Sequence, residues 1–293
     1  MPVRDYGIPP PKYRLPERTR LGPVRLQVRN LARSMAYYER VLGLRRLAGA
    51  GDAIALATEG EDQPLVWLHE RPDARPVPHG GRLGLYHFAI LVPDRAALGR
   101  FVRHLGELGE YAGSADHAVS EALYLSDPDG LGIEVYADRP RESWRVDDRQ
   151  LHMTTERLNV RDLLLAAPAA PWTGMPGGTV IGHVHLHVGD LDRAAAFYHE
   201  GLGLDKVVWN YPGALFLSAG GYHHHLGTNT WSSGPPATDQ DSRLLSWTVV
   251  LPSPADVDAA ARSLESAGGP INREESAVTA ADPWGTVVRI VAG

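Results

Sequence analysis

Histidines occupy alternate positions of one short apolar stretch. The segment I-G-H-V-H-L-H-V (181–188) carries His183, His185 and His187 in a chain with 13 histidines. In an extended strand, residues two apart lie on the same face, so the three imidazoles are expected on one side and the apolar residues on the other. Imidazoles bind divalent metals and transfer protons near neutral pH. The stretch therefore predicts a strand that lines a chemical site.

A second cluster, G-G-Y-H-H-H-L-G-T-N (220–229), follows the first. The chain has no cysteine, which excludes disulfides, thiolate metal ligands and cysteine nucleophiles. Histidine, aspartate and glutamate remain as strong metal ligands. The alternatives to a chemical site are a strand whose histidines face water and a glycine-flanked loop of solvent-facing histidines.

The overall composition narrows the function classes. The chain has 293 residues, of which 43% are hydrophobic and 22% charged, as in a globular protein of about two domains. No stretch reaches the roughly 18 apolar residues of a membrane-spanning helix, and no signal peptide is evident, so we expect a cytoplasmic protein. The net charge of −6 is not concentrated in a basic patch, which argues against a nucleic-acid partner.

The elements around the histidines recur along the chain. Residues 24–44 return as residues 184–204 without a gap, and each copy reads as a strand followed by a helix. Residues 86–105 match residues 246–264 more weakly. Both members of this second pair later reach a D-P-x-G turn and a final strand. Four copies of one unit are therefore expected.

The predicted fold class is α+β. The expected βαβββ modules lie near residues 21–72, 82–140, 177–232 and 242–293. The first pair spans 21–140 and the second pair 177–293, with an N-terminal extension (1–20) and a linker region (141–176). Within the linker, the segment A-A-P-A-A-P-W-T-G-M-P-G-G is expected to be irregular. A helix outside each module leaves a curved sheet inside, so two modules would enclose a cup.

The repeated unit has the pattern V-x-L-x-V-x-D-L-x-x-A-x-x-F-Y-x-x-x-L-G-L, and the second module ends in D-P-D-G-L-G-I-E-V-Y. These two patterns resemble those of the vicinal oxygen chelate superfamily, which holds glyoxalase I, bleomycin-resistance proteins and extradiol dioxygenases. Together with Y-H-F-A-I-L-V-P-D-R and the histidine-rich segments, they resemble the four-module, catechol 2,3-dioxygenase-like branch over about residues 21–293.

The resemblance implies that a module donates metal ligands from the start of its first strand and from the middle of its last strand. Aligned on the turn that follows, the first-strand positions are Pro23, His87, His183 and Ser246. The last-strand position is Glu134 in the second module and Arg289, which cannot bind a cation, in the fourth. The remaining set of His87, His183 and Glu134 is typical of non-haem iron(II) sites. Manganese(II) is the next candidate metal.

The distribution of these ligands predicts how the modules pair. Sequential pairing would place the ligands in two cups, whereas pairing the second module with the third collects them in one. The first and fourth modules would then form a second cup without a metal. This arrangement departs from the better-known extradiol enzymes, in which the resemblance places all three ligands in one C-terminal domain.

The same resemblance implies further catalytic groups. Tyr124 lies where ring-cleaving relatives keep a tyrosine beside the substrate hydroxyl. His117 resembles the histidine of these relatives that hydrogen-bonds to the substrate or orients a metal ligand. In the H-H-H run, strand parity favours His224 as the acid–base catalyst, with His225 close behind.

We therefore expect an iron(II) extradiol dioxygenase that cleaves a small aromatic diol, of catechol or hydroquinone type, with dioxygen. The alternatives are a glyoxalase-like isomerase or lyase, whose sites usually need a fourth protein ligand, and a non-enzymatic protein that sequesters small molecules. A monomer and a homo-oligomer both fit the sequence.

Overall fold

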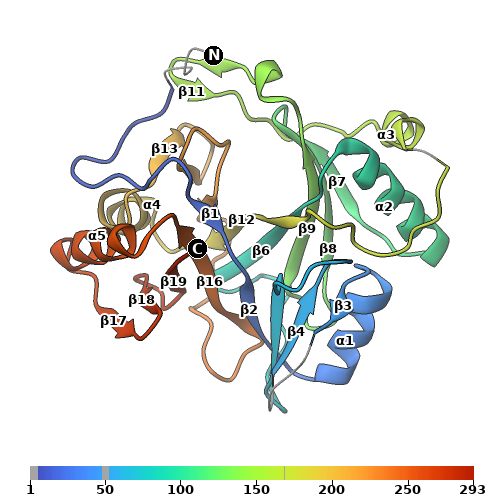
Figure 1. The fold of residues 1–293 in the computed structure, drawn as a ribbon, viewed down its shortest axis with the longest axis horizontal. Coiled ribbons are helices and arrows are strands. Elements are labelled where there is room, and N and C mark those ends of the chain that lie inside the picture. Colours follow the sequence, from blue (N-terminus) through green and yellow to red (C-terminus); the bar gives the residue numbers. More distant parts are fainter. Residues whose placement is uncertain (1–5, 48–52, 168) are drawn as a thin grey trace.

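Two β-sheets form the inside of the molecule, and the helices lie on the outside (Figure 1). The computed structural model describes residues 6–47, 53–167 and 169–293. None of the helices in these ranges is long and apolar enough to cross a membrane. The element order repeats βαβββ along the chain, and the expected α+β class is confirmed.

The second and third modules share one eight-stranded sheet, the central-module sheet. The second module supplies β6 (Gly84–Leu91), β7 (Gly113–Asp116), β8 (Ser120–Ser126) and β9 (Gly132–Asp138). The third module supplies β12 (Val180–His187), β13 (Asp205–Val208), β14 (Ala214–Ser218) and β15 (Leu226–Asn229). Strands β6 and β12 meet antiparallel at the centre, and each pairs in parallel with the last strand of its own module.

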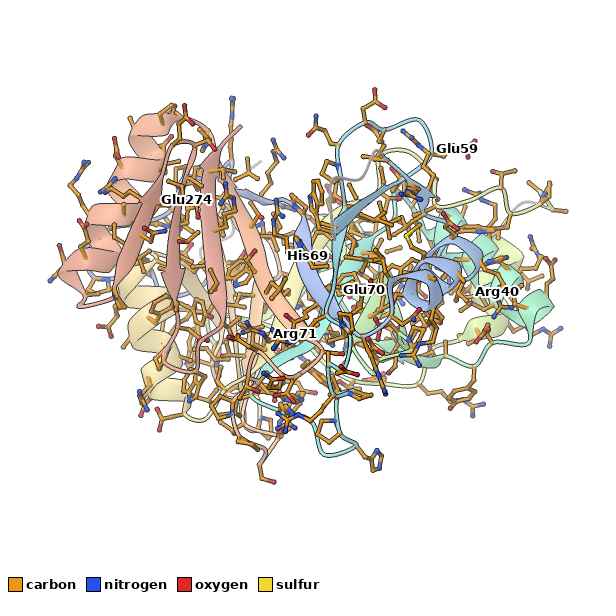
Figure 2. The ribbon with its side chains drawn as sticks, turned by 90° about the horizontal axis from the view of Figure 1, so that it is seen from below. Arg40, Glu59, His69, Glu70, Arg71 and Glu274 are labelled. Atoms are coloured by element: carbon orange, nitrogen blue, oxygen red, sulfur yellow. The ribbon has the colours of Figure 1, made fainter. Side chains whose placement is uncertain are left out.

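The first and fourth modules share the other sheet, the terminal-module sheet, seen with its side chains in Figure 2. The first module supplies β2 (Val24–Val28), β3 (Arg45–Arg46), β4 (Ala53–Ala57) and β5 (Val66–Glu70). The fourth supplies β16 (Arg243–Leu251), β17 (Ile271–Glu274), β18 (Ala277–Ala281) and β19 (Val287–Ala292), and β1 (Arg20–Leu21) pairs with β16. The predicted pairing of modules is therefore confirmed.

One helix follows the first strand of every module. These helices are α1 (Leu31–Arg40), α2 (Arg95–Leu108), α4 (Leu191–Ala195, continued by a π-helical segment, Ala196–Gly201) and α5 (Pro254–Ser266). Each begins where a short polar side chain accepts a hydrogen bond from the backbone N–H three residues later. The capping residues are Asn30, Asp94, Asp190 and Ser253. Such caps satisfy donors that the first helical turn cannot.

The alternation in β12 separates the core from the cup. Val184, Leu186 and Val188 are fully buried in the main hydrophobic core. The histidines between them face the opposite side of the sheet, as the period of two requires. The expectation from the sequence is confirmed for this strand.

The linker region contains more regular structure than its composition suggests. It includes a 3₁₀ turn (Arg141–Ser143), a short hairpin of β10 (Val146–Asp147) and β11 (Gln150–Leu151), and helix α3 (Val160–Ala166). Residues 169–179 are irregular, as the sequence predicts. Helix α3 packs beside α2, so the linker is part of the folded unit (Figure 1).

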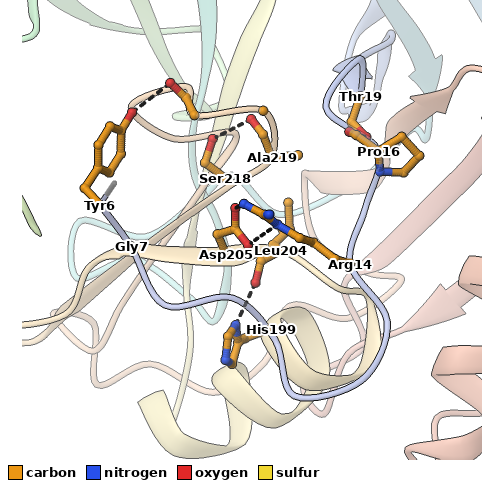
Figure 3. Close-up of polar contacts among 12 residues, drawn as sticks. Tyr6, Gly7, Arg14, Pro16, Thr19, His199, Leu204, Asp205, Ser218 and Ala219 are labelled. Atoms are coloured by element: carbon orange, nitrogen blue, oxygen red, sulfur yellow. Dashed lines mark hydrogen bonds and ion pairs between the residues drawn. The ribbon is translucent and has the colours of Figure 1, made fainter. Parts of the chain in front are cut away.

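The N-terminal extension braces the third module (Figure 3). The guanidinium of Arg14 binds both carboxylate oxygens of Asp205 at 2.8 and 2.6 Å, and the Tyr6 hydroxyl donates to the Gly221 carbonyl at 2.7 Å. Gly220 has a φ of 61°, and a Cβ there would overlap the Glu17 carbonyl. The extension therefore holds the loop that carries the H-H-H run.

Candidate metal centre

The three expected ligands meet at the centre of the central-module sheet. Strand β6 lies between β12 and β9, and its Ala89 is opposite His183 on one side and Glu134 on the other. His87 lies two residues earlier on the same strand and therefore on the same face. The small Ala89 leaves space between the two flanking ligands, and all three ligand side chains are buried.

Their donor atoms converge on one point. The Nε2 atoms of His87 and His183 lie 3.0 and 3.2 Å from the same oxygen, Oε2 of Glu134, and the three ligand atoms are within 4.8 Å of one another. His87 Nε2 is buried, and its contact with Glu134 lacks the geometry of a hydrogen bond. Two imidazoles and a carboxylate that converge in this way fit a divalent cation.

A β-bulge helps to position His183. The register of β12 against β6 shifts between Ile181 and His183, so Gly182 is an extra residue in the strand. A Cβ at Gly182 would overlap the hydroxyl of Tyr136. Glycine is therefore required for the close approach that sets His183 opposite Ala89.

Electrostatics favour the protonation states that a metal needs. Burial opposes ionisation of Glu134, but His183 and His87 outweigh it and hold the pKa of Glu134 well below its usual range. Burial lowers the pKa of His183 to about 4. At neutral pH the site therefore offers an ionised carboxylate and a neutral imidazole, the forms that bind metals.

A cavity of about 640 Å³ opens above the three ligands. Its walls are largely aromatic, and several come from loops and from the linker region. Beyond the expected site residues, the lining includes Tyr86, Met153, Thr155, Tyr211, Phe216 and Trp231. A mostly apolar pocket with a few convergent polar groups suits a small aromatic ligand.

The structure brings Tyr124 and His117 to this cavity. Tyr124 on β8 pairs directly with Glu134 on β9, and its hydroxyl lies 2.6 Å from His117 Nε2. His117 Nδ1 lies 2.6 Å from the Thr154 carbonyl, which only accepts, so Nδ1 carries the proton and Nε2 accepts from Tyr124. Burial and the charge of Glu134 raise the pKa of Tyr124 well above 10, so this phenol stays protonated.

The H-H-H run divides between the cavity and its surroundings. His224 lines the cavity, with its ring centroid 4.1 Å from that of His183. His225 does not line it, and its Nδ1 instead accepts from the Ala219 backbone N–H at 3.2 Å. Of the two candidates for acid–base catalysis, the geometry therefore favours His224 and disfavours His225.

The two companions of His183 are tied to one asparagine. Asn229 donates from Nδ2 to His185 Nε2 at 3.0 Å and accepts from His187 Nδ1 at 2.7 Å. Both histidines are buried beside the rings of Tyr86 and its neighbours. Of the two, His185 lines the cavity next to the ligands, whereas His187 lies outside its lining, so the sequence expectation holds for His185 only.

Comparisons with known proteins agree with this geometry. Residues 20–135 and 180–290 match the model of the glyoxalase/bleomycin resistance protein/dioxygenase superfamily. The chain belongs to this superfamily. A catechol-2,3-dioxygenase from Bacillus subtilis (strain 168) is 45% identical over 272 residues, which are 91% of this chain and 95% of that protein.

Two solved structures show the same superfamily fold at low sequence identity. A candidate dioxygenase from Bacillus subtilis subsp. subtilis str. 168 superposes with a TM-score of 0.66 at 14% identity, covering 96% of this chain and 86% of that one. Glyoxalase I from Zea mays superposes with a TM-score of 0.57 at 17% identity, and the superposition covers 94% of this chain and 92% of that one. The fold thus agrees with the superfamily that the family model and the 45% identical relative establish, and the resemblance expected from the sequence is confirmed.

Sequence reasoning within the superfamily pattern missed the cavity walls and two polar groups beside the cavity, the buried His223 and the partly exposed Asp138. Thr155, Tyr211 and Trp231 lie in segments without periodicity, so nothing in the sequence placed them. Asp138 and His223 hydrogen-bond to each other beside the cavity. The only available signal was the position of Asp138 four residues after Glu134, at the end of the same strand.

Proposed function

We propose that this chain is a non-haem iron(II) extradiol dioxygenase that cleaves a catechol-type aromatic diol. The observation that carries the proposal is the convergence of His87, His183 and Glu134 at the base of an aromatic-lined cavity. The 45% identity to a catechol-2,3-dioxygenase over nearly the whole chain supports the same reaction class.

The donor set favours iron(II), with manganese(II) as the next candidate. Two histidines and one carboxylate on one face are typical of iron(II) oxygenases, because three coordination positions remain open. When bound, the metal supplies those positions to the diol oxygens and to dioxygen. The closely grouped ligands number three among the described residues, whereas a glyoxalase-like site usually needs a fourth.

The protein side chains then have separate tasks. The rings of Tyr86, Phe216 and Trp231 hold the aromatic ring by stacking and edge contacts and exclude water. His224 accepts a proton from one diol hydroxyl and returns it later in the reaction. Tyr124, whose hydroxyl donates to His117, accepts a hydrogen bond from the other diol hydroxyl.

Anaerobic reconstitution tests the proposal. Purified protein is loaded with iron(II) or manganese(II), exposed to oxygen and assayed with a panel of catechols and hydroquinones for yellow ring-fission products. We expect about one metal per chain and ring cleavage of a catechol, with both lost in His183→Ala. Metal binding with glyoxalase-type isomerisation and no ring cleavage would overturn it. So would tight binding of aromatics without any metal, because that result indicates a sequestering protein.

A further inference from the structure

Two consecutive hydrogen bonds lead from His224 away from the cavity to the partly exposed Asp138. Its Nδ1 lies 2.7 Å from Nδ1 of His223, and His223 Nε2 lies 2.9 Å from Oδ1 of Asp138. His223 is fully buried, whereas the Asp138 side chain is 28% exposed at the end of β9. None of these three groups belongs to the converging ligand set.

Each contact in the chain constrains where protons lie. A carboxylate only accepts, so the Asp138 contact requires a proton on His223 Nε2. In a neutral imidazole the other nitrogen then carries a lone pair, and His223 Nδ1 accepts. With His223 neutral, the one proton that the short contact between the two Nδ1 atoms needs comes from His224 Nδ1. His224 Nε2 is consequently left unprotonated.

We propose that Asp138 and His223 are positioning residues that fix His224 as the Nδ1–H tautomer, with Nε2 free to accept a proton from the substrate. The catalytic meaning of this assignment rests on the proposed function, but the tautomer itself does not. The logic matches that of catalytic triads, in which a third group holds the base in the correct tautomer and orientation.

The surroundings keep the chain in place. The Tyr222 hydroxyl also donates to Asp138 Oδ1, at 3.1 Å, and a Trp144 ring packs edge-on against His223 at 5.5 Å. Asp138, at the end of β9, accepts hydrogen bonds from both Tyr222 and His223, so the loop that carries these two residues is held to β9. The terminal-module sheet lacks this arrangement, since Gln63 and Pro64 occupy the positions equivalent to His223 and His224 at the repeat offset.

Nitrogen-15 NMR of histidine side chains measures the tautomer directly. Metal-free protein labelled with ¹⁵N-histidine is compared with His224→Ala, which identifies the His224 signals by their loss. We expect the Nδ1–H tautomer of His224 to predominate in the wild type. In His223→Phe, which keeps a ring but removes both nitrogens, the Nε2–H tautomer should become substantially populated.

Two further variants make the result decisive. His199→Phe applies the same change to a buried histidine outside the cavity, whose Nδ1 donates to the Leu204 carbonyl (Figure 3), and it should leave His224 unaffected. Asp138→Asn, which keeps the shape but no longer requires a proton on His223 Nε2, should shift the tautomer in the same direction as His223→Phe. It also serves as the test if that variant does not fold.

Iron-loaded enzyme provides the second readout. With metal content and KM retained, kcat should fall about 10- to 100-fold in His223→Phe and in Asp138→Asn, the usual range for lost supporting partners. An Nε2–H tautomer of His224 in the wild type, or an unchanged tautomer in both variants, would overturn the inference while ring cleavage stands. A correct tautomer without ring cleavage would overturn the proposed function alone.

Discussion

The two sheets of this protein share one architecture and differ in the residues at equivalent positions. Val184 pairs with Leu226 in the central-module sheet as Val24 pairs with Val66 in the terminal-module sheet. The backbone scaffold is thus duplicated, whereas among the described residues a group that could hold a metal ion occurs once. The fold alone therefore does not create the site.

Charge is handled differently in the two sheets. Ala89 pairs with Glu134 in one sheet, and Thr248 pairs with Arg289 in the other. The Arg289 guanidinium forms an ion pair with Glu274, and Arg25 stacks over the Trp67 ring at 4.8 Å. These two arginines of the terminal-module sheet therefore have partners within the protein, while the central-module sheet gathers a buried carboxylate and imidazoles that suit a cation.

Matched glutamine substitutions should give the largest contrast between the sheets. In Glu134→Gln, a neutral amide replaces the ionised ligand, so we expect most bound metal and all ring cleavage to be lost. Arg289→Gln, at the equivalent position of the fourth module, should retain one metal per chain. The metal content per chain of both variants is measured after reconstitution. Full metal occupancy in Glu134→Gln would contradict the proposed metal site.

Within the H-H-H run, His224→Ala should lower kcat by about 10²- to 10⁴-fold with metal content retained, because a general acid–base group is lost. His225→Ala should keep turnover close to that of the wild type, since His225 does not line the cavity. Steady-state kinetics and metal analysis on both variants test this order. The reverse order would transfer the role to His225, and loss of metal in His224→Ala would make it a ligand.

The pH dependence of stability offers a smaller contrast. Burial lowers the pKa of His225 to about 3, so between that value and the usual pKa near 6.5 the unfolded chain binds more protons than the folded chain. The resulting stability is present above pH 6.5 and is lost as the pH falls. Between pH 7 and 5 this linkage amounts to about 1–2 kcal/mol.

The variant His225→Leu introduces the residue found at the equivalent position, Leu65. It should reduce the loss of unfolding free energy between pH 7 and pH 5 by about 1–2 kcal/mol. Urea unfolding of the metal-free proteins at pH 7 and pH 5 measures the difference. An equal loss of unfolding free energy in both proteins would show that His225 is not buried in its neutral form.

The smallest effect is expected in the terminal-module sheet. Arg25→Gln should change kcat and KM less than about twofold, because distant sites act independently. Its unfolding free energy should fall by about 0.5–1 kcal/mol through loss of the stack on Trp67. A large loss of turnover would mean that the two sheets are functionally coupled.

Sequence reasoning was strongest where the chain repeats itself. The copies at 24–44 and 184–204 predicted the modules, and the positions of His87, His183 and Glu134 predicted the pairing that the strand order confirms. These predictions depend on period and register, which the sequence contains directly.

The parts of the candidate site that the sequence did not predict depend on loops. Of residues 223–225, only His224 lines the cavity, yet the run lies in a loop before β15, so the parity of a strand is not the reason. The contact of His223 with Asp138 joins two modules through the fold, which no local pattern encodes. The linker residue Thr155 reaches the cavity for the same reason.

The strands of the central-module sheet lie in the sequence between the two halves of the terminal-module sheet, and this order has a consequence for synthesis on the ribosome. Strand β2 emerges early, but its antiparallel partner β16 belongs to the last module. The central-module sheet has all its strands once β15 has emerged, whereas the other sheet must wait for β19. During elongation, nascent chains therefore complete the central-module sheet first, while the edge of β2 that pairs with β16 is still unpaired and open to wrong pairing.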